Sequence, residues 1–348
     1  MKRAVRLALF LMLIPVLVAA EWRGRWSAEL AGDEVWLELS SRATAGSRFR
    51  VNLDVLAADF TELDTSAFDQ DDVKLTFSLQ REPGVFGFEG RTLDGTALGR
   101  CTFESNDAFE QALQQRGFGH LREEELVVLA IHDVRLSVVD ELAKLGYDDL
   151  TSDELLSFTI HAVTPEYVRA LARWGAGDLE ADEILSFRIH AVDGEFIADL
   201  EAAGLSRLRP EDLLQAAIHG VDPRFVAEMR ALGFEGLGFK TLLDFRIHGV
   251  DKRFVDDMHA AGFENLDAED LVQFRIHGVS RRFIDDMAEL GYDGLRERDV
   301  LQMRIHGVDR RFVLEMRDLG YDDLSLEELL QLKIHGVDPD YVRRLRRR

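Results

Sequence analysis

A short phrase, Ile-His-Gly-Val or a close variant, recurs in this chain at a constant spacing of 29 residues. No insertion breaks the register from the first copy to the last. A fixed period of about 20–50 residues is typical of repeat proteins, in which each repeat packs mainly on its neighbours. We number the copies 1 to 8 by their histidines, which are His132, His161, His190, His219, His248, His277, His306 and His335.

Each repeat predicts two short helices. In one repeat, Asp222 is the expected N-cap and Pro223 the first helical residue, and the apolar face of this helix begins at Phe225. Gly233 is expected to end this helix, and a second helix then carries the phrase and ends at Gly249. Other copies show pairs at capping-box spacing, namely Thr151 with Glu154, Asp267 with Asp270, and Ser325 with Glu328.

The phrase itself is predicted to be a structural helix end. Histidine is favoured in a last helical turn by the carbonyl dipole, and it can cap a free carbonyl there. We expect positive φ at Gly249 and Gly278, and less regular ends at Ala162 and Ala191, because left-handed backbone costs alanine about 1 kcal/mol or more. The capping set comprises the eight histidines with Gly220, Gly249, Gly278, Gly307 and Gly336.

The eight histidines also raise the possibility of a metal site. Zinc needs several ligands at about 2–2.3 Å, whereas stacked repeats place equivalent side chains about 10 Å apart. One histidine per repeat therefore forms a ladder, and we expect no metal and no cofactor. A pH-sensing role stays open, because histidine titrates near neutrality.

Residues 21–105 differ from the rest of the chain. Alternation at Val35, Leu37 and Leu39 indicates half-buried antiparallel strands, and the pattern returns twice more. About six strands are predicted, with turns at Pro83-Gly84 and Asp94-Gly95. Cys101 is expected to be a small buried residue. The expected core aromatics are Trp22, Trp26, Trp36, Phe86, Phe88 and Phe103.

Residues 1–20 have the features of a secretory signal peptide. Lys2, Arg3 and Arg6 form a basic start, Leu7 to Val18 is apolar, and Val18-Ala19-Ala20 is a small-residue cleavage site. The apolar run is short for a membrane span, although an uncleaved anchor is the alternative. We expect an exported protein, periplasmic or extracellular, without a membrane span after cleavage. The single cysteine excludes an intramolecular disulfide.

The predicted architecture is mainly α: a signal peptide (1–20), an antiparallel β-domain (21–105), and an α-solenoid of about eight two-helix repeats (106–348) that ends in a basic tail. The β-domain is expected to be a sandwich or a lipocalin-like barrel. The phrase Phe-Arg-Ile-His-Gly-Val at 245–250, followed by Asp-x-x-Phe-Val, resembles a repeat of exported bacterial proteins. It is also similar to repeats in extracytoplasmic regions of BlaR-type regulatory membrane metallopeptidases. The His-Glu-x-x-His peptidase motif is absent from this sequence, so the resemblance implies the repeat and no activity.

The chain is acidic, with a formal net charge of −23, which argues against general binding to nucleic acid. Basic residues nevertheless gather at one turn of the repeat, and acidic residues at the other. Stacking would align these basic residues into an edge that suits an anionic envelope polymer or an acidic protein segment. The alternative is that they pair with acids of neighbouring repeats. The predicted edge comprises Arg224, Arg246, Lys252, Arg253, Arg275, Arg281, Arg282, Arg304, Arg310, Arg311 and Lys333.

No nucleophile elbow, P-loop, dinucleotide fingerprint or zinc motif occurs in the sequence. We therefore expect a non-enzymatic binding scaffold whose partner is a protein or an anionic envelope polymer. The alternative is a small-ligand sensor, in which the β-domain is a ligand cup and the helical region docks or transmits. An empty apolar cavity in the β-domain would favour the sensor, and a filled core would not.

Overall fold

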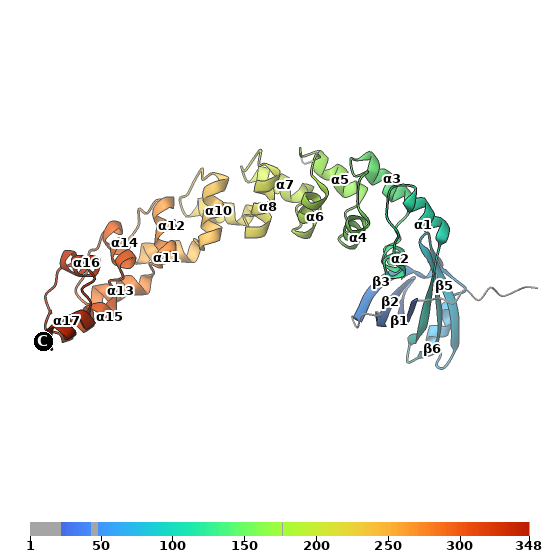
Figure 1. The fold of residues 1–348 in the computed structure, drawn as a ribbon, viewed down its shortest axis with the longest axis horizontal. Coiled ribbons are helices and arrows are strands. Elements are labelled where there is room, and N and C mark those ends of the chain that lie inside the picture. The colour runs from blue at the N-terminus through green and yellow to red at the C-terminus, as the bar shows by residue number, and fades with distance from the viewer. Residues whose placement is uncertain (1–21, 43–47, 176, 348) are drawn as a thin grey trace, which may run out of the picture. The chain divides into compact units, whose positions relative to one another are not determined.

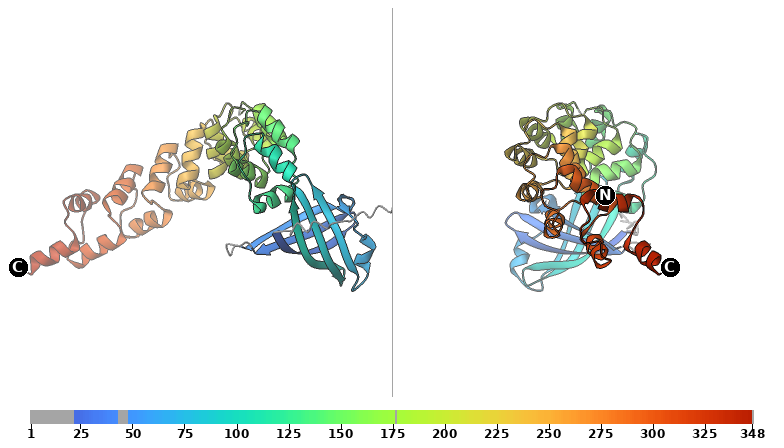
Figure 2. Two further views of the ribbon diagram at one scale, coloured as in Figure 1. Left: turned by 45° about the vertical axis from the view of Figure 1, so that its right-hand side comes forward. Right: turned by 90° about the vertical axis from the view of Figure 1, so that its left-hand side faces the viewer.

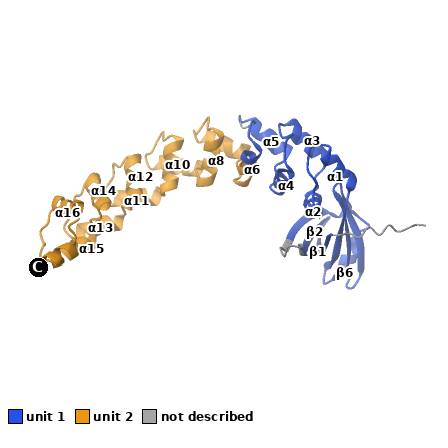
Figure 3. Ribbon diagram, in the orientation of Figure 1, with its two compact units in different colours: residues 1–185 blue, residues 186–348 orange. Residues whose placement is uncertain are grey.

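The computed structural model describes residues 22–42, 48–175 and 177–347; the expected signal peptide lies outside this part of the chain. An N-terminal antiparallel sheet is followed by a helical region (Figure 1). The change from strand to helix falls between Ser105 and Asp107. The chain divides into two compact units, Met1–Leu185 and Ser186–Arg348, so their boundary lies inside a helix (Figure 3).

The β-domain is one curled sheet of seven strands, where the sequence predicts about six (Figure 2). Its spatial order is β3-β2-β1-β7-β6-β5-β4, and every neighbouring pair is antiparallel. Turns join β5 to β6 at Glu82-Pro83 and β6 to β7 at Asp94-Gly95. The strands are β1 (Trp22–Ala31), β2 (Glu34–Arg42), β3 (Arg48–Leu56), β4 (Phe60–Thr61), β5 (Lys74–Arg81), β6 (Gly84–Leu93) and β7 (Thr96–Ser105).

Aromatic rings fill the inner face of the sheet. Trp26 packs edge-on against Phe77 and Phe88, and these two rings stack on each other with centroids 4.7 Å apart. The indole N–H of Trp26 donates to the Arg100 carbonyl at 3.0 Å, which satisfies a buried donor. Trp36 is not part of this core. Because it alternates with Val35 and Leu37, it lies on the outer face and is 53% exposed.

Seventeen helices follow in the described part of the chain. The helices that carry the phrase, here called phrase helices, alternate with intervening helices. The phrase helices are α2 (Glu123–Ile131), α4 (Ser152–Ile160), α6 (Ala181–Ile189), α8 (Pro210–His219), α10 (Phe239–His248), α12 (Ala268–Ile276), α14 (Glu297–His306) and α16 (Leu326–Ile334). The intervening helices are α1 (Asp107–Gln114), α3 (Leu136–Lys144), α5 (Pro165–Ala172), α7 (Gly194–Ala202), α9 (Pro223–Ala231), α11 (Lys252–Ala260), α13 (Arg281–Glu289), α15 (Arg310–Asp318) and α17 (Pro339–Arg346).

Helices of one kind contact one another along the chain. Within the second unit, α10 contacts α8 and α12, and α14 contacts α12 and α16. Intervening helices form a second row, in which α13 contacts α11 and α15, and α15 contacts α17. Such short helices are marginal in isolation, so these lateral contacts supply most of their stability.

The predicted helix starts and ends are observed. Capping boxes begin α4 at Thr151, α12 at Asp267 and α16 at Ser325. Gly249 and Gly278 have φ of 72° and 67°, which confirms the left-handed ends.

The expectation of less regular ends at the two alanines is wrong. Ala162 and Ala191 adopt φ of 54° and 56°. The hydrogen bond from Val163 N to Phe158 O is 2.8 Å long and matches the one from Val250 N to Phe245 O at 2.7 Å. The phrase helix therefore ends in the same left-handed conformation whether alanine or glycine occupies this position.

In the first unit, the sheet and the first copy of the phrase are joined by side chains. Helix α2 contacts β6 and β7. Arg81, at the end of β5, lies 3.5 Å from the Asp133 carboxylate just after α2. The backbone N–H of Leu136 donates to Glu82 Oε2 at 2.9 Å. The N-cap residue of α3 is Arg135, whose side chain makes no cap hydrogen bond, so the β5–β6 turn supplies the cap.

Candidate functional site

Three arginines of the predicted basic edge, each one residue before the isoleucine of the phrase, join neighbouring copies. The Nε atoms of Arg246 and Arg275 each donate at 2.6 Å to a carbonyl one copy back, those of Gly220 and Gly249. Arg304 donates to His277 O at 3.0 Å. These bonds satisfy carbonyls at helix ends that have no partner within the helix. We call Arg246, Arg275 and Arg304 the lock arginines.

Each lock arginine also lies over an aromatic ring. The Cζ atoms of Arg246, Arg275 and Arg304 are 4.0, 4.5 and 5.0 Å from the ring centroids of Phe225, Phe254 and Phe283. Lys333 repeats the contact, with Nζ 4.3 Å above Phe312. A planar guanidinium can stack on a ring and donate a hydrogen bond at the same time. These cations are therefore used in contacts within the chain.

The first position of three intervening helices is also basic, and these side chains form ion pairs. Lys252 lies 2.8 Å from Asp256, and Arg281 lies 3.7 Å from Asp285 on its own helix. Arg310 reaches back to the preceding intervening helix, where it contacts Glu289 at 2.6 Å and Asp286 at 3.2 Å. Within this row, only Arg310 therefore fits the alternative that the basic edge pairs with acids of neighbouring repeats, while Lys252 and Arg281 pair within their own helices.

The second position of four intervening helices forms the most exposed row, which we call the outer arginines: Arg224, Arg253, Arg282 and Arg311. Arg282 is 3.9 Å from Asp286, but its side chain is 92% exposed. Arg311 contacts Glu315 at 2.7 Å and is 84% exposed. Exposed pairs of this kind contribute only about 0–1 kcal/mol, so the outer arginines retain much of their availability.

Carboxylates lie close to the outer arginines. The N-cap side chains of Asp222, Asp251 and Asp309 accept the backbone N–H three residues later, which uses a donor that an anion would otherwise bind. A surface hollow of about 600 Å³ beside Arg253 is lined by Glu228, Asp251, Lys252, Asp256 and Asp257. The edge therefore carries both signs of charge.

The eight histidines lie in the last turn or at the C-cap of the phrase helices. Burial lowers the pKa of the His132 imidazole. His306 Nε2 is 3.2 Å from Gln302 Oε1. Among the described residues, no three His, Cys, Asp or Glu side chains are grouped so that they could hold a metal ion.

The feature that the sequence reading missed is a row of exposed isoleucines. The isoleucine of the phrase is between 44% and 54% exposed in copies 2 to 8. We call these seven residues the isoleucine ladder: Ile160, Ile189, Ile218, Ile247, Ile276, Ile305 and Ile334. Scattered exposed apolar residues need no explanation, but a large one at one register position in seven consecutive copies does.

Copy 1 shows what the same face looks like when it is covered. Ile131 is 8% exposed, and Val127, one turn earlier, is 2% exposed. In the second unit the residue four before the isoleucine is again apolar and only half-buried, as at Leu243 and Val272. The difference in copy 1 is that its phrase helix packs on β6 and β7.

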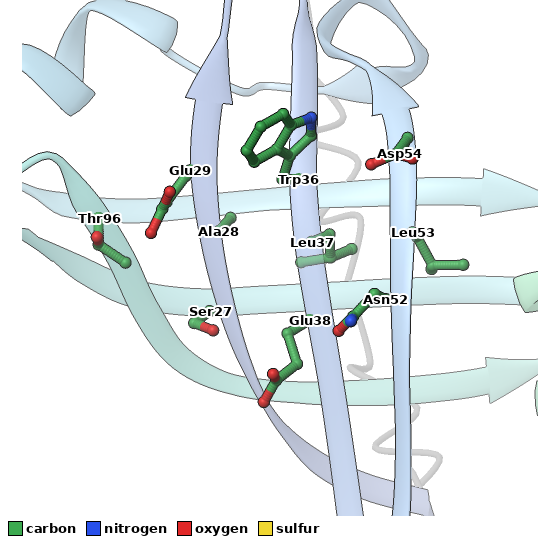
Figure 4. A pocket seen from close by; sticks show the side chains of 10 residues that line it. All are labelled: Ser27, Ala28, Glu29, Trp36, Leu37, Glu38, Asn52, Leu53, Asp54 and Thr96. Carbon is green, nitrogen blue, oxygen red and sulfur yellow. The ribbon is translucent and has the colours of Figure 1, made fainter.

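The outer face of the sheet carries an exposed aromatic residue, Trp36. Trp36 lies directly between Glu29 on β1 and Asp54 on β3. These side chains border a shallow hollow of about 390 Å³ that Glu38 and Asn52 also line (Figure 4). The hollow lies on the solvent side of the sheet, whereas the ligand-cup prediction places a cavity inside it.

The sheet interior also holds the only cysteine. Burial raises the pKa of the Cys101 thiol to about 12, so the reactive thiolate is scarce at neutral pH.

A scan against protein-family models finds no match to this chain, and a search of curated proteins finds no similar sequence. No helix in the described ranges combines the length and apolar character needed to cross a membrane.

Proposed function

We propose that this chain is an exported, non-enzymatic binding scaffold, in which a β-domain precedes an α-solenoid of eight 29-residue two-helix repeats. The solenoid is supported by the constant sequence period and by the two rows of like helices within the second unit. Export is supported by the composition of residues 1–20. The relation to exported bacterial repeat proteins is supported by the phrase and its period together.

The isoleucine ladder is the observation that carries the binding function. A helix with apolar side chains on more than one face is normally buried. The phrase helices use one apolar face for the array, as at Leu242 and Phe245, which are 1% and 0% exposed. They present a second apolar face at Leu243 and Ile247. Since folding leaves the isoleucine of this second face exposed in copies 2 to 8, we assign this face to a partner.

A site-directed photo-crosslink tests the assignment. Ile276→Cys is labelled with a benzophenone maleimide, incubated with the native envelope fraction and irradiated. Cys101 is buried with a raised pKa, so the wild-type chain is an unlabelled background. Leu314→Cys is the matched control, because Leu314 is 41% exposed but lies on the intervening helix α15. We expect a discrete product from position 276 alone. Equal products, or none, from both positions would contradict the assignment.

The outer arginines support a second candidate, namely binding of an acidic polysaccharide or acidic protein segment. Their exposure favours it, and the carboxylates among them weaken it. Changing Arg253, Arg282 and Arg311 together to Glu should abolish binding to heparin-agarose and leave the melting temperature nearly unchanged. Wild-type binding should also fall with added salt, because charges are screened beyond about 8 Å at physiological ionic strength. Salt-insensitive or absent binding by the wild type would remove this candidate.

The sensor alternative is less well supported. Its ligand cup requires space inside the sheet, and the inner face is occupied by packed rings such as Phe86, Phe88 and Phe103.

A further inference from the structure

The exposed face of the phrase helices carries a charge as well as apolar groups. Residues four and seven positions before the isoleucine fall within about 40° of it around the helix, since each residue turns by about 100°. In α10 these are Leu243 and Lys240, which join Ile247 in one stripe along the helix. Each of α8, α10, α12, α14 and α16 presents the same stripe, and adjacent helices of this row are in contact. Five stripes therefore lie side by side in the second unit.

The charge at the start of each stripe alternates in sign. The five residues are Glu211, Lys240, Glu269, Arg298 and Glu327, and all five are exposed. Reading the four members from α8 to α14 backwards gives the opposite sign at every position. A surface with this property is complementary to its own reverse.

We propose that the occupant of this face is a second copy of the same chain, bound antiparallel. The two-fold axis lies between α10 and α12 and runs along the helix direction. It places α10 against α12 of the second copy, and α8 against α14. Each phrase helix keeps its direction under this operation, so Lys240 faces Glu269 and Glu211 faces Arg298. The inference rests on the proposed function, because it names the partner of the ladder.

Three further arguments favour this occupant. A partner must present apolar groups at the spacing of the repeats, and a second ladder has that spacing by construction. An interface about a two-fold axis also uses the same patch on both chains, which suits a self-complementary surface. In addition, copy 1 shows that this face is buried when an apolar surface of this same chain is available to it.

Sedimentation velocity and light scattering on the full-length chain test the proposal. We expect twice the chain mass, and a reversible shift to the single-chain mass on dilution. The double variant Ile247→Gln/Ile276→Gln should be a monomer with unchanged circular dichroism, because glutamine keeps helix propensity and both sites are exposed. Leu314→Gln, which lies off the ladder, should still form the dimer. A monomeric wild-type chain at every concentration, or a dimer that survives the double variant, would overturn the proposal.

A charge-swap cycle tests the antiparallel register. Lys240→Glu places like charges against Glu269 at two symmetric positions, and Glu269→Lys does the same with the other sign. Each should weaken the dimer on the order of tenfold, as expected for a few exposed charge pairs. The combined swap should return the dissociation constant to near the wild-type value. Equal weakening without recovery in the combined variant would overturn this register.

The crosslinking experiment separates this inference from the proposed function. A product from Ile276→Cys at twice the chain mass supports the second copy. A discrete product of any other mass leaves the ladder as a binding surface and overturns the second copy as its occupant. The absence of any product specific to position 276 contradicts both.

Discussion

Phrase helices α2 and α10 present the same positions to different surroundings. In α2, Val127 and Ile131 are buried against the sheet, whereas in α10 Leu243 is half-buried and Ile247 is 48% exposed. The start of the intervening helix that follows each phrase helix also differs. Glu82 of the β-domain caps α3, whereas α11 is capped by its own N-cap residue, Asp251. The β-domain thus provides the first copy with contacts that later copies obtain locally or lack. Residues identical by register can therefore belong to the core in one copy and lie at the surface in another.

The largest expected effect separates buried from exposed copies of the isoleucine. Ile131→Ala should lower the free energy of unfolding of the first unit by about 2–4 kcal/mol, because it leaves a cavity between α2 and the sheet. Ile247→Ala, measured in the monomer, should cost less than about 1 kcal/mol. Urea unfolding followed by circular dichroism checks both. Equal costs at the two sites would show that the ladder belongs to the core.

The second effect separates the lock arginines from the outer arginines. Arg275→Ala removes both the bond to Gly249 O and the stack on Phe254, so it should destabilise the chain by about 1–3 kcal/mol. Arg282→Ala should change stability by less than about 0.5 kcal/mol. Arg275→Lys should fall between them, because Lys333 shows that lysine keeps the aromatic contact. Thermal denaturation of the three variants is the measurement, and an identical loss for Arg275→Ala and Arg282→Ala would contradict the lock.

The third effect compares alanine and glycine at the end of the phrase helix. Ala162→Gly should stabilise the chain by about 1 kcal/mol, since glycine adopts φ of 54° without strain. Gly278→Ala should destabilise the chain by more than this ~1 kcal/mol, because a Cβ at position 278 would lie 2.7 Å from Arg304 Nη2. Gly307→Ala should be milder, since its nearest contact is Lys333 Nζ at 3.8 Å. Melting temperatures in the order Gly307→Ala above Gly278→Ala would support this account, and the reverse order would contradict it.

The smallest effect is a pH dependence with opposite signs in two capping boxes. Hydrogen bonds from the Thr151 backbone and side chain lower the pKa of Glu154. The stability that Glu154 contributes is present above the pKa of Glu154 in the unfolded chain. It is lost as the pH falls through the lower pKa that Glu154 has in the folded chain. Burial raises the pKa of Asp270, so protonation favours its folded state as the pH falls. Glu154→Gln should therefore flatten the acid limb of the stability curve and Asp270→Asn should steepen it, as measured by urea midpoints between about pH 5 and pH 3.

Local rules explain what could be predicted from the sequence. Capping pairs such as Ser325 with Glu328, and left-handed glycines such as Gly249, depend on residues a few positions apart, so the sequence displays them directly. The exposed position of Trp36 could have been predicted, because it alternates with Val35 and Leu37. The wrong placement came from treating every aromatic residue of the domain as core.

The roles of Arg275 and Ile276 were harder to predict. The carbonyl that Arg275 contacts lies 26 residues away, and no local pattern marks it. Isoleucine is a residue type that is usually found in the core. Only the position of Ile276 relative to Leu271 and Phe274 shows that it lies on a different face of the helix. Apolar residues both four positions before and at the isoleucine were a signal that could have revealed this second face.

The lock arginines also bear on how such a chain changes length. Arg304 reaches the copy before its own through His277 O and stacks on Phe283 within its own repeat, and its equivalents behave alike. Deleting or duplicating one 29-residue unit between two lock copies would therefore recreate the same contact at the new junction. Unequal recombination between the repeated gene segments could lengthen or shorten the array without inventing a new interface. The alternating charges would not survive such an event in register, so a change in copy number would alter the proposed pairing with a second copy before it altered the fold.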